Sequence, residues 1–360
     1  MITVLAVSFF FAVPVWASEP ATPEMTVNDA IQRALNHSNS VKKAAKSVDL
    51  TDYVREYKAD RLNYMPTEPP GMPAVEATWA DLLTANLNWR MAEKSLTAEE
   101  DKVALDACNK YWSIQQAIGN VETAKLSLKQ AELDWQKASA YYKAGLTSME
   151  TLLGAEAQLS AAKAALKDAQ NNLDKAYADF NQLIGLRPED RPVLTDEIVF
   201  APLEETNLNF IVATVIENSP TVWLAQQKVE LQKTLENLMF YTGEYVTYKQ
   251  RKTEVEQARL DAASAEDAVE TLTRALYYSV RTLEENYPAA EQAVKVAEEN
   301  LRVTELKYQV GMAIKADVVA SEASLAQARQ KLLDLKKNHA YLKLALTKPW
   351  AYQISAMQAS

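Results

Sequence analysis

A long internal repeat constrains this chain more than any other feature of its sequence. Eleven residues recur in the same order at a constant offset of 166 positions, without an insertion. The first-copy residues are Tyr111, Ser113, Ala124, Ala131, Tyr142, Gly145, Glu156, Ala157, Leu159, Leu166 and Asn172, and the second-copy residues are Tyr277, Ser279, Ala290, Ala297, Tyr308, Gly311, Glu322, Ala323, Leu325, Leu332 and Asn338. An ungapped repeat of this length indicates duplication of one helical hairpin, so we expect two equivalent halves. The repeated residues are apolar, small or turn-forming, which describes architecture better than an active site.

The distribution of Gly and Pro predicts an all-α fold with very long helices. The 360 residues include only 7 Gly, and none of the 13 Pro lies between Pro73 and Pro188. That interval is rich in strong helix formers. We predict helices at about 29–64, 80–143, 148–184 and 207–241, one from the connection at Gly243 to about 310 with a kink at Pro288, and one at 314–346. We expect Met65 to Glu76 to be a loop, because it holds several prolines.

Apolar residues at alternating spacings of three and four predict a narrow coiled-coil seam in each hairpin. In the first copy they are Val121, Ala124, Leu128, Ala131, Trp135, Ala138 and Tyr142, then Leu152, Ala155, Leu159, Ala162, Leu166, Ala169, Leu173, Ala176, Phe180 and Leu183. In the second copy they are Tyr287, Ala290, Val294, Ala297, Leu301, Thr304 and Tyr308, then Val318, Ser321, Leu325, Ala328, Leu332, Leu335, His339, Leu342 and Leu346. A helix of ~60 residues extends about 90 Å, so two such hairpins form a rod. We expect such a rod either to be a structural support or to line a passage.

The N-terminus resembles a secretory signal peptide. Residues 1–17 carry no charge, contain the apolar run Val4 to Val13, and end in the small-residue pattern Val15-Trp16-Ala17. The basic segment that usually opens such a peptide is missing, and a buried N-terminal helix is the alternative. No later segment approaches 18 consecutive apolar residues, so we expect no membrane-spanning helix. We therefore expect an exported protein of the cell envelope, in the periplasm or the outer membrane.

The repeat and the prolines also divide the chain. We predict a first helical repeat at 26–186, a linker at 187–206, a second helical repeat at 207–347 and a C-terminal tail at 348–360. The linker contains Pro188, Pro192 and Pro202.

Charge and residue usage exclude several kinds of function. The formal net charge is −10, with both signs interleaved along the helices, which indicates a solvated surface and no nucleic-acid partner. Cys108 is the only cysteine, and the two histidines, His37 and His339, lie in different halves. Motifs for a metal, a cofactor or a nucleophile are absent, and adjacent glutamates such as Glu298-Glu299 are explained by solvated helix faces. We expect neither an enzyme nor a bound cofactor or metal.

The two predicted turns carry a more specific signal. Tyr142-Lys143-Ala144-Gly145-Leu146-Thr147-Ser148, followed by Leu152-Leu153-x-Ala155-Glu156-Ala157-x-Leu159, resembles the hairpin tip of the TolC-like outer-membrane efflux protein family. Tyr308-Gln309-Val310-Gly311, followed by Asp317-Val318-Val319-x-Ser321-Glu322-Ala323-x-Leu325, resembles the matching second tip. The repeat starts, at Ala30 to Asn39 and at Val212 to Pro220, and the Met65-Pro66 step are similar too. The resemblance covers about Thr26 to Leu346.

The resemblance implies a homotrimer whose hairpins form a hollow α-barrel. Such a tunnel receives substrate from an inner-membrane pump through a periplasmic adaptor, also called a membrane fusion protein, and conducts it out of the cell. The residues implied at the adaptor-contacting tips are Gly145, Leu146, Thr147, Gly311, Met312 and Ala313. Asp317 stands where the family carries an acidic residue that constricts the entrance. A second acidic position of the family is Ala320 here, which weakens the implied ring. The alternative for Asp317 is a capping role in the last helix.

The sequence departs from the family pattern at its transmembrane β-hairpins. A membrane strand needs ~9–11 residues, and only 65–88 and 241–248 are available for them. We therefore expect two tandem coiled-coil hairpins with shorter helices and little or no β-barrel, although Val75 to Trp89 could hold one amphipathic strand. Membrane association is left open. Two functions remain: a conduit component of a tripartite efflux or type I secretion system, and a non-conducting structural coiled-coil protein of the envelope.

Overall fold

The computed structural model describes residues 22–62, 73–205, 207–238 and 247–352. Its helices are α1 (Val27–His37), α2 (Asn39–Asp60), α3 (Pro73–Lys143), α4 (Met149–Ile184), α5 (Leu208–Asn218), α6 (Pro220–Leu238), α7 (Tyr248–Gln309) and α8 (Lys315–Thr347). Within these ranges the strands are β1 (Glu24–Met25) and β2 (Val193–Leu194), which pair in parallel. The all-α prediction is confirmed. The expected signal peptide at 1–17 lies outside the described residues.

The first helix of each repeat differs from the prediction, because a serine divides it into two. Ser38 has φ −55° and ψ 120°, which ends α1, and its hydroxyl oxygen accepts a hydrogen bond from the Val41 N–H at 3.3 Å to begin α2. Ser219 separates α5 from α6 in the same way and is followed by Pro220. Serine favours a cap over a helix interior, and Pro is well accommodated at the first position of a helix. The single helices predicted at 29–64 and 207–241 are therefore wrong.

The start of α3 also differs from the prediction. The helix begins at Pro73, so the end of the expected loop at Met65 to Glu76 is helical, as Pro permits in a first turn. The alternative of a strand over Val75 to Trp89 is wrong, because the whole of that segment lies inside α3. Residues 63–72 contain most of the expected loop and its Met65-Pro66 step, and residues 239–246 contain the expected connection at Gly243. Both segments lie outside the described ranges.

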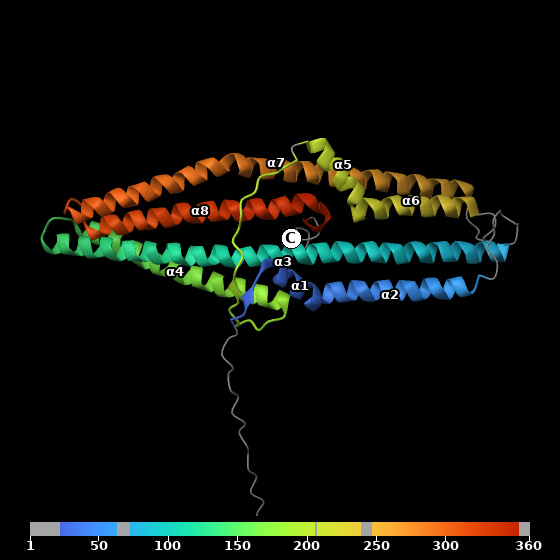
Figure 1. The fold of residues 1–360 in the computed structure, drawn as a ribbon, viewed down its shortest axis with the longest axis horizontal. Coiled ribbons are helices and arrows are strands. Elements are labelled where there is room, and N and C mark those ends of the chain that lie inside the picture. The colour runs from blue at the N-terminus through green and yellow to red at the C-terminus, as the bar shows by residue number, and fades with distance from the viewer. Residues whose placement is uncertain (1–21, 63–72, 206, 239–246, 353–360) are drawn as a thin grey trace, which may run out of the picture.

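The later helices follow the predicted seams. Along α4 from Thr151 to Ala176, every position of the predicted seam is half-buried while most other positions are exposed. The helix ends at Gly185, which has φ +76°. Helix α7 continues through Pro288, and Figure 1 shows that it changes direction between its two ends. In the described part of the chain, no helix is long and apolar enough to cross a membrane.

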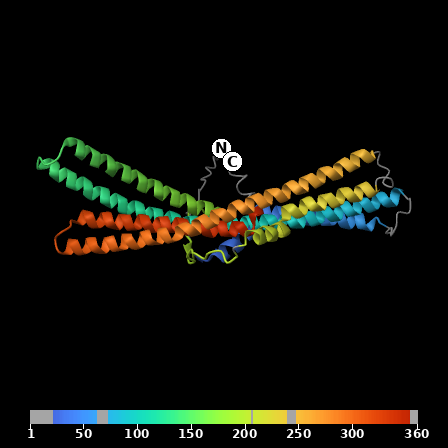
Figure 2. The ribbon, with the colours of Figure 1, turned by 90° about the horizontal axis from the view of Figure 1, so that it is seen from above.

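The helices form an elongated layer with α3 at its centre (Figure 1). Helix α3 packs against α1, α2, α4, α6 and α8. In the half that ends at the two hairpin turns, the order across the layer is α4, α3, α8, α7, and in the other half it is α2, α3, α6, α7. Figure 2 shows that the α3–α4 and α7–α8 hairpins diverge toward their turns. One edge of the layer is therefore α7, and the other is α4 in one half and α2 in the other.

Two hydrophobic clusters near the middle of the rod hold the halves together. The first surrounds Tyr111 and Phe180, whose rings meet edge to face at 6.1 Å. The second includes Val222, Tyr277 and Trp350. The indole N–H of Trp350 donates to an Asp101 carboxylate oxygen at 2.9 Å. The first residues of the segment predicted as a C-terminal tail are thus packed into the core.

The linker crosses the layer as a strap (Figure 1), held at both ends by buried polar groups. The Tyr111 hydroxyl donates to the Met25 carbonyl at 2.9 Å and accepts from the Asp196 N–H at 3.0 Å. At the other end, the Leu203 N–H donates to Glu284 on α7 at 2.6 Å. His339, which is 1% exposed, lies 3.2 Å from the same carboxylate oxygen. These contacts tie the linker to both repeats.

Candidate docking site at the hairpin tips

The first hairpin turn is built around a left-handed glycine. Gly145 has φ +73°, a conformation that costs an L-residue with a side chain roughly 1–2 kcal/mol. The Leu146 N–H donates to the Tyr141 carbonyl and the Gly145 N–H to the Tyr142 carbonyl, both at 2.9 Å. This pair of bonds is the Schellman motif, which satisfies the last carbonyls of α3. Ser148 then caps α4, because its hydroxyl oxygen accepts from the Thr151 N–H at 3.3 Å.

The second hairpin turn repeats this geometry. Gly311 has φ +75°. The Met312 N–H donates to the Lys307 carbonyl at 2.7 Å, and the Gly311 N–H donates to the Tyr308 carbonyl at 3.0 Å. The same motif therefore ends α3 and α7, and the two turns lie at the same end of the molecule (Figure 1). A Cβ added at either glycine would meet no atom within 4 Å, so the backbone alone requires glycine there.

Both tips expose large apolar side chains to solvent. Leu146 is 75% exposed and Met312 is 78% exposed, at equivalent positions directly after the glycine. Thr147 and Ala313 follow them and are half-buried. Clustered apolar exposure of this kind is typical of a contact surface. The structure therefore presents the tip residues that the resemblance implied as one exposed end of each hairpin.

Sequence reasoning missed several further residues of this surface. Val310 is 69% exposed just before the second glycine, and Met149, Leu153 and Ile314 are about half exposed just after the turns. The signal that could have found them is their place outside the predicted seams. An apolar residue that the hairpin itself does not bury needs another explanation, such as a partner surface.

Asp317 lies in the first turn of α8 and acts on the helix terminus. Its carboxylate accepts a hydrogen bond from the Ile314 N–H at 3.0 Å. Ile314 occupies the N-cap position but has no side-chain acceptor, so Asp317 provides the only side-chain hydrogen bond that we find at this cap in the described chain. A carboxylate here also interacts favourably with the positive end of the helix dipole. The capping role predicted as the alternative is thus present in the structure.

A polar junction joins the two hairpins where they begin to diverge. The Gln116 and Gln330 side-chain amides donate to the same Asp334 carboxylate oxygen at 2.8 and 2.9 Å. Gly119 allows this approach, because a Cβ there would lie 2.0 Å from the Gln330 side-chain oxygen. Toward the tips, Lys129 on α3 and Glu322 on α8 form an ion pair at 3.1 Å.

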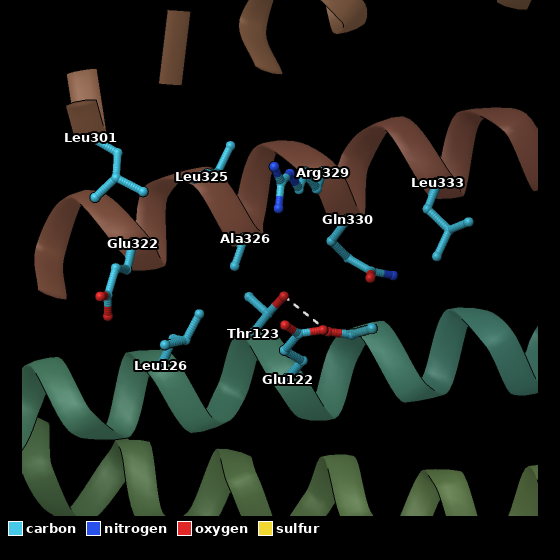
Figure 3. Close-up of a pocket in the computed structure, with 11 residues that line it drawn as sticks. Glu122, Thr123, Leu126, Leu301, Glu322, Leu325, Ala326, Arg329, Gln330 and Leu333 are labelled. Carbon is cyan, nitrogen blue, oxygen red and sulfur yellow. Dashed lines mark hydrogen bonds between the residues drawn. The ribbon is translucent and has the colours of Figure 1, made fainter. Parts of the chain in front are cut away.

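Between this junction and the ion pair lies a cleft of about 360 Å³. Figure 3 shows that Gln330 and Glu322 project from α8 toward α3, where Thr123 and Leu126 face them. Of these four, only Gln330 is buried. The described residues contain no group of His, Cys, Asp and Glu side chains arranged to hold a metal ion. Burial raises the pKa of the Cys108 thiol to about 11, so that thiol is protonated and unreactive at neutral pH.

Comparison with known proteins finds relatives in structure only. No family model and no curated protein matches the sequence. Among solved structures, the outer membrane protein VceC from Vibrio cholerae is 17% identical with a TM-score of 0.63, over 90% of this chain and 96% of that one. The outer-membrane channel OprN is 12% identical with a TM-score of 0.66, over 90% of both chains. The Campylobacter jejuni CmeC outer membrane channel is 12% identical with a TM-score of 0.60, over 98% of this chain and 94% of that one.

The chain has a TolC-like fold. The resemblance inferred from the two hairpin tips is confirmed at the level of the fold, over almost the whole described chain. The structural neighbours are channel proteins.

Proposed function

We propose that this protein is an extracytoplasmic conduit component of a tripartite efflux or type I secretion system. In this proposal three copies, exported to the cell envelope, close into a helical tunnel that receives substrate from an inner-membrane pump and a periplasmic adaptor. The TolC-like fold with two exposed, equivalent tips is the observation that supports it. A structural spacer would need the turns, but it would not need large apolar side chains exposed on both of them.

The edges of the helical layer support closure into a ring. On α7, a second stripe at spacings of three and four is exposed or half-exposed outside the seam with α8, and it comprises Ala289, Ala293, Val296, Asn300 and Val303. In the other half of the layer, the edge opposite α7 is α2, which exposes Leu50, Tyr53, Val54 and Tyr57. The two edges of one molecule are different surfaces. Contact between unlike edges is heterologous, and such contacts close into rings when the rotation between copies permits.

The tips and Asp317 receive roles within this proposal. We assign adaptor contact to Gly145, Leu146 and Thr147 on the first tip and to Gly311, Met312 and Ala313 on the second. Exposed Leu146 and Met312 provide apolar area for that contact. Three copies of Asp317 would form one acidic ring at the entrance, in addition to capping α8, and would attract cations.

The test combines oligomeric mass with adaptor capture. We expect the purified mature chain to have the mass of a trimer in light scattering. The pump and adaptor of the same export system should be retained on it, and a variant with Leu146→Asp and Met312→Asp should lose them while remaining a trimer. A monomer would contradict the conduit. A trimer that retains no adaptor, and whose deletion leaves export unchanged, would favour the structural coiled-coil protein instead.

A further inference from the structure

The duplication repeats the residues of a contact that joins the two hairpins. Within the chain, the Lys129 ammonium on α3 lies 3.1 Å from the Glu322 carboxylate on α8. The constant offset of 166 positions carries Lys129 onto Lys295 of α7, and carries Glu156 of α4 onto Glu322. The chain therefore contains the same lysine and the same glutamate twice.

In a single molecule this second pair cannot form, because α7 and α4 are the opposite edges of the layer (Figure 1). The Lys295 side chain is 60% exposed and lies 3.5 Å from Glu291 of its own helix. Glu156 is exposed, and we find no ion pair to it in the described part of the chain. Both groups are therefore accessible to another molecule.

The apolar residues near Glu322 on α8 are also repeated near Glu156 on α4. On α8, Val319 and Ala323 are 2% and 1% exposed, and they share the helix face of Gln330, which points to α3. Their counterparts on α4 are Leu153, which is 51% exposed, and Ala157, which is also exposed. The face of α8 that packs against α3 is thus repeated on α4, where it is exposed to solvent.

At the junction, the repeat reverses which of the two facing helices carries the large residue. Gly119 on α3 faces the large Gln330 on α8, and a Cβ at Gly119 would displace the Gln330 side-chain oxygen. Their counterparts are Glu285 on α7, which is large, and Ala164 on α4, which is small, and both are exposed. In each pair one residue is large and the other is small: the large one lies on α8 in the first pair and on α7 in the second. A close approach of α7 to α4 is therefore sterically allowed.

We infer that α7 of one copy packs against α4 of the next copy as α3 packs against α8 within a chain, with Lys295 paired to Glu156 of the next copy. The inference rests on the proposed trimer and names its contact. Helices α3 and α8 run antiparallel, and so do α7 and α4. The same contact would therefore occur six times in a ring of three chains, three times within a chain and three times between neighbouring chains.

Zero-length amine-to-carboxylate crosslinking of the purified protein tests the pair directly. Equal amounts of unlabelled and 15N-labelled chains are dissociated, mixed and allowed to reassemble, and crosslinked peptides are then identified by mass spectrometry. We expect the crosslink between Lys129 and Glu322 to join chains of the same label only. The crosslink between Lys295 and Glu156 should show about half mixed labels. The internal crosslink serves as the positive control for the chemistry.

The outcomes separate this inference from the proposed function. A trimer that gives the internal crosslink but none between Lys295 and Glu156 would overturn the inference and leave the trimer standing. A monomeric mass would contradict the proposed trimer itself. As a second measurement, Lys295→Glu should raise the dissociation constant of the oligomer by about fivefold per contact. Lys295→Glu combined with Glu156→Lys should restore it, and equal weakening in the double variant would again overturn the pair.

Discussion

At single residues, the geometry of the two tips makes the clearest prediction. Gly145 and Gly311 both have φ near +75°, and valine is strained there whatever space is open around it. We expect Gly145→Val or Gly311→Val to cost about 1–2 kcal/mol, confined to the turn. Binding to the adaptor should fall more than the melting temperature does, because the tip surface is displaced while the seams remain. Pull-down and thermal unfolding of the same samples measure the two effects.

Gly154 provides a matched control for these variants. It lies inside α4 without a positive φ, and a Cβ there would also meet no atom within 4 Å. Gly154→Ala should raise stability by up to about 1 kcal/mol, since Ala is the stronger helix former. If the valine variants lost stability and adaptor binding in equal measure, the glycines would serve the hairpin turn only.

Asp317 has a capping role in the structure and an entrance role in the proposal, and one substitution separates them. Asp317→Asn removes the charge beside the Ile314 N–H. We expect a loss of about 0.5 kcal/mol of stability from the weaker interaction with the helix dipole. If the acidic ring exists, cation sensitivity of a reconstituted channel should fall as well. Unchanged cation sensitivity and throughput would leave only the cap.

Glu284, which holds one end of the strap, is expected to make the free energy of unfolding depend on pH. Burial raises the pKa of its carboxyl, but hydrogen bonds from Leu203, His339 and Arg281 outweigh burial and hold that pKa below the ordinary 4.5. A depressed pKa in the folded state contributes stability above the unfolded value, and this contribution is lost as pH falls through the folded value. We expect the free energy of unfolding to fall more steeply below pH 4.5 in the natural protein than in Glu284→Gln. Parallel curves for the two would contradict it.

At the level of helices, the junction between α3 and α8 is stabilised by one shared acceptor. Asp334 accepts from Gln116 and Gln330, and removing it leaves both amides without that partner. We expect Asp334→Ala to cost about 1–3 kcal/mol, since hydrogen bonds to a charged acceptor contribute more than neutral ones and Gln330 would keep only its bond to the Gln116 carbonyl at 3.2 Å. Asp168, its repeat counterpart, is exposed on α4. Asp168→Ala should stay within about 0.5 kcal/mol in urea unfolding, and equal losses would refute the junction's role.

The helix pairs show which features of the helices can be predicted from a sequence. Seam positions repeat at a fixed spacing, so the pairing of α3 with α4 and of α7 with α8 was predictable. The break at Ser219 could have been predicted from the following Pro220, which favours the first position of a helix. The break at Ser38 could not, because a serine within a helical pattern has no local mark that separates a cap from a tolerated interior residue. The packing of adjacent segments turns the chain there and decides between the two.

For the whole molecule, we expect an elongated and almost wholly helical assembly. Helix α3 alone has 71 residues, about 107 Å at 1.5 Å per residue. Circular dichroism should show a helical spectrum, and small-angle scattering should give a rod-like distance distribution longer than 100 Å. Substantial strand content, or a compact particle, would contradict both the fold and the proposed tunnel.

The sequence by itself determined the helical class, the two hairpins and the positions of the glycine turns. Each of these depends on residues close together in the chain, and the repeat at 166 positions tests each of them twice. Only the tertiary structure decided that α3 occupies the centre of the layer, that Gln330 meets Gly119, and that the strap is fixed at Glu284. Those contacts join residues tens to hundreds of positions apart. Steric fit between whole elements selects them, and no local pattern records that fit.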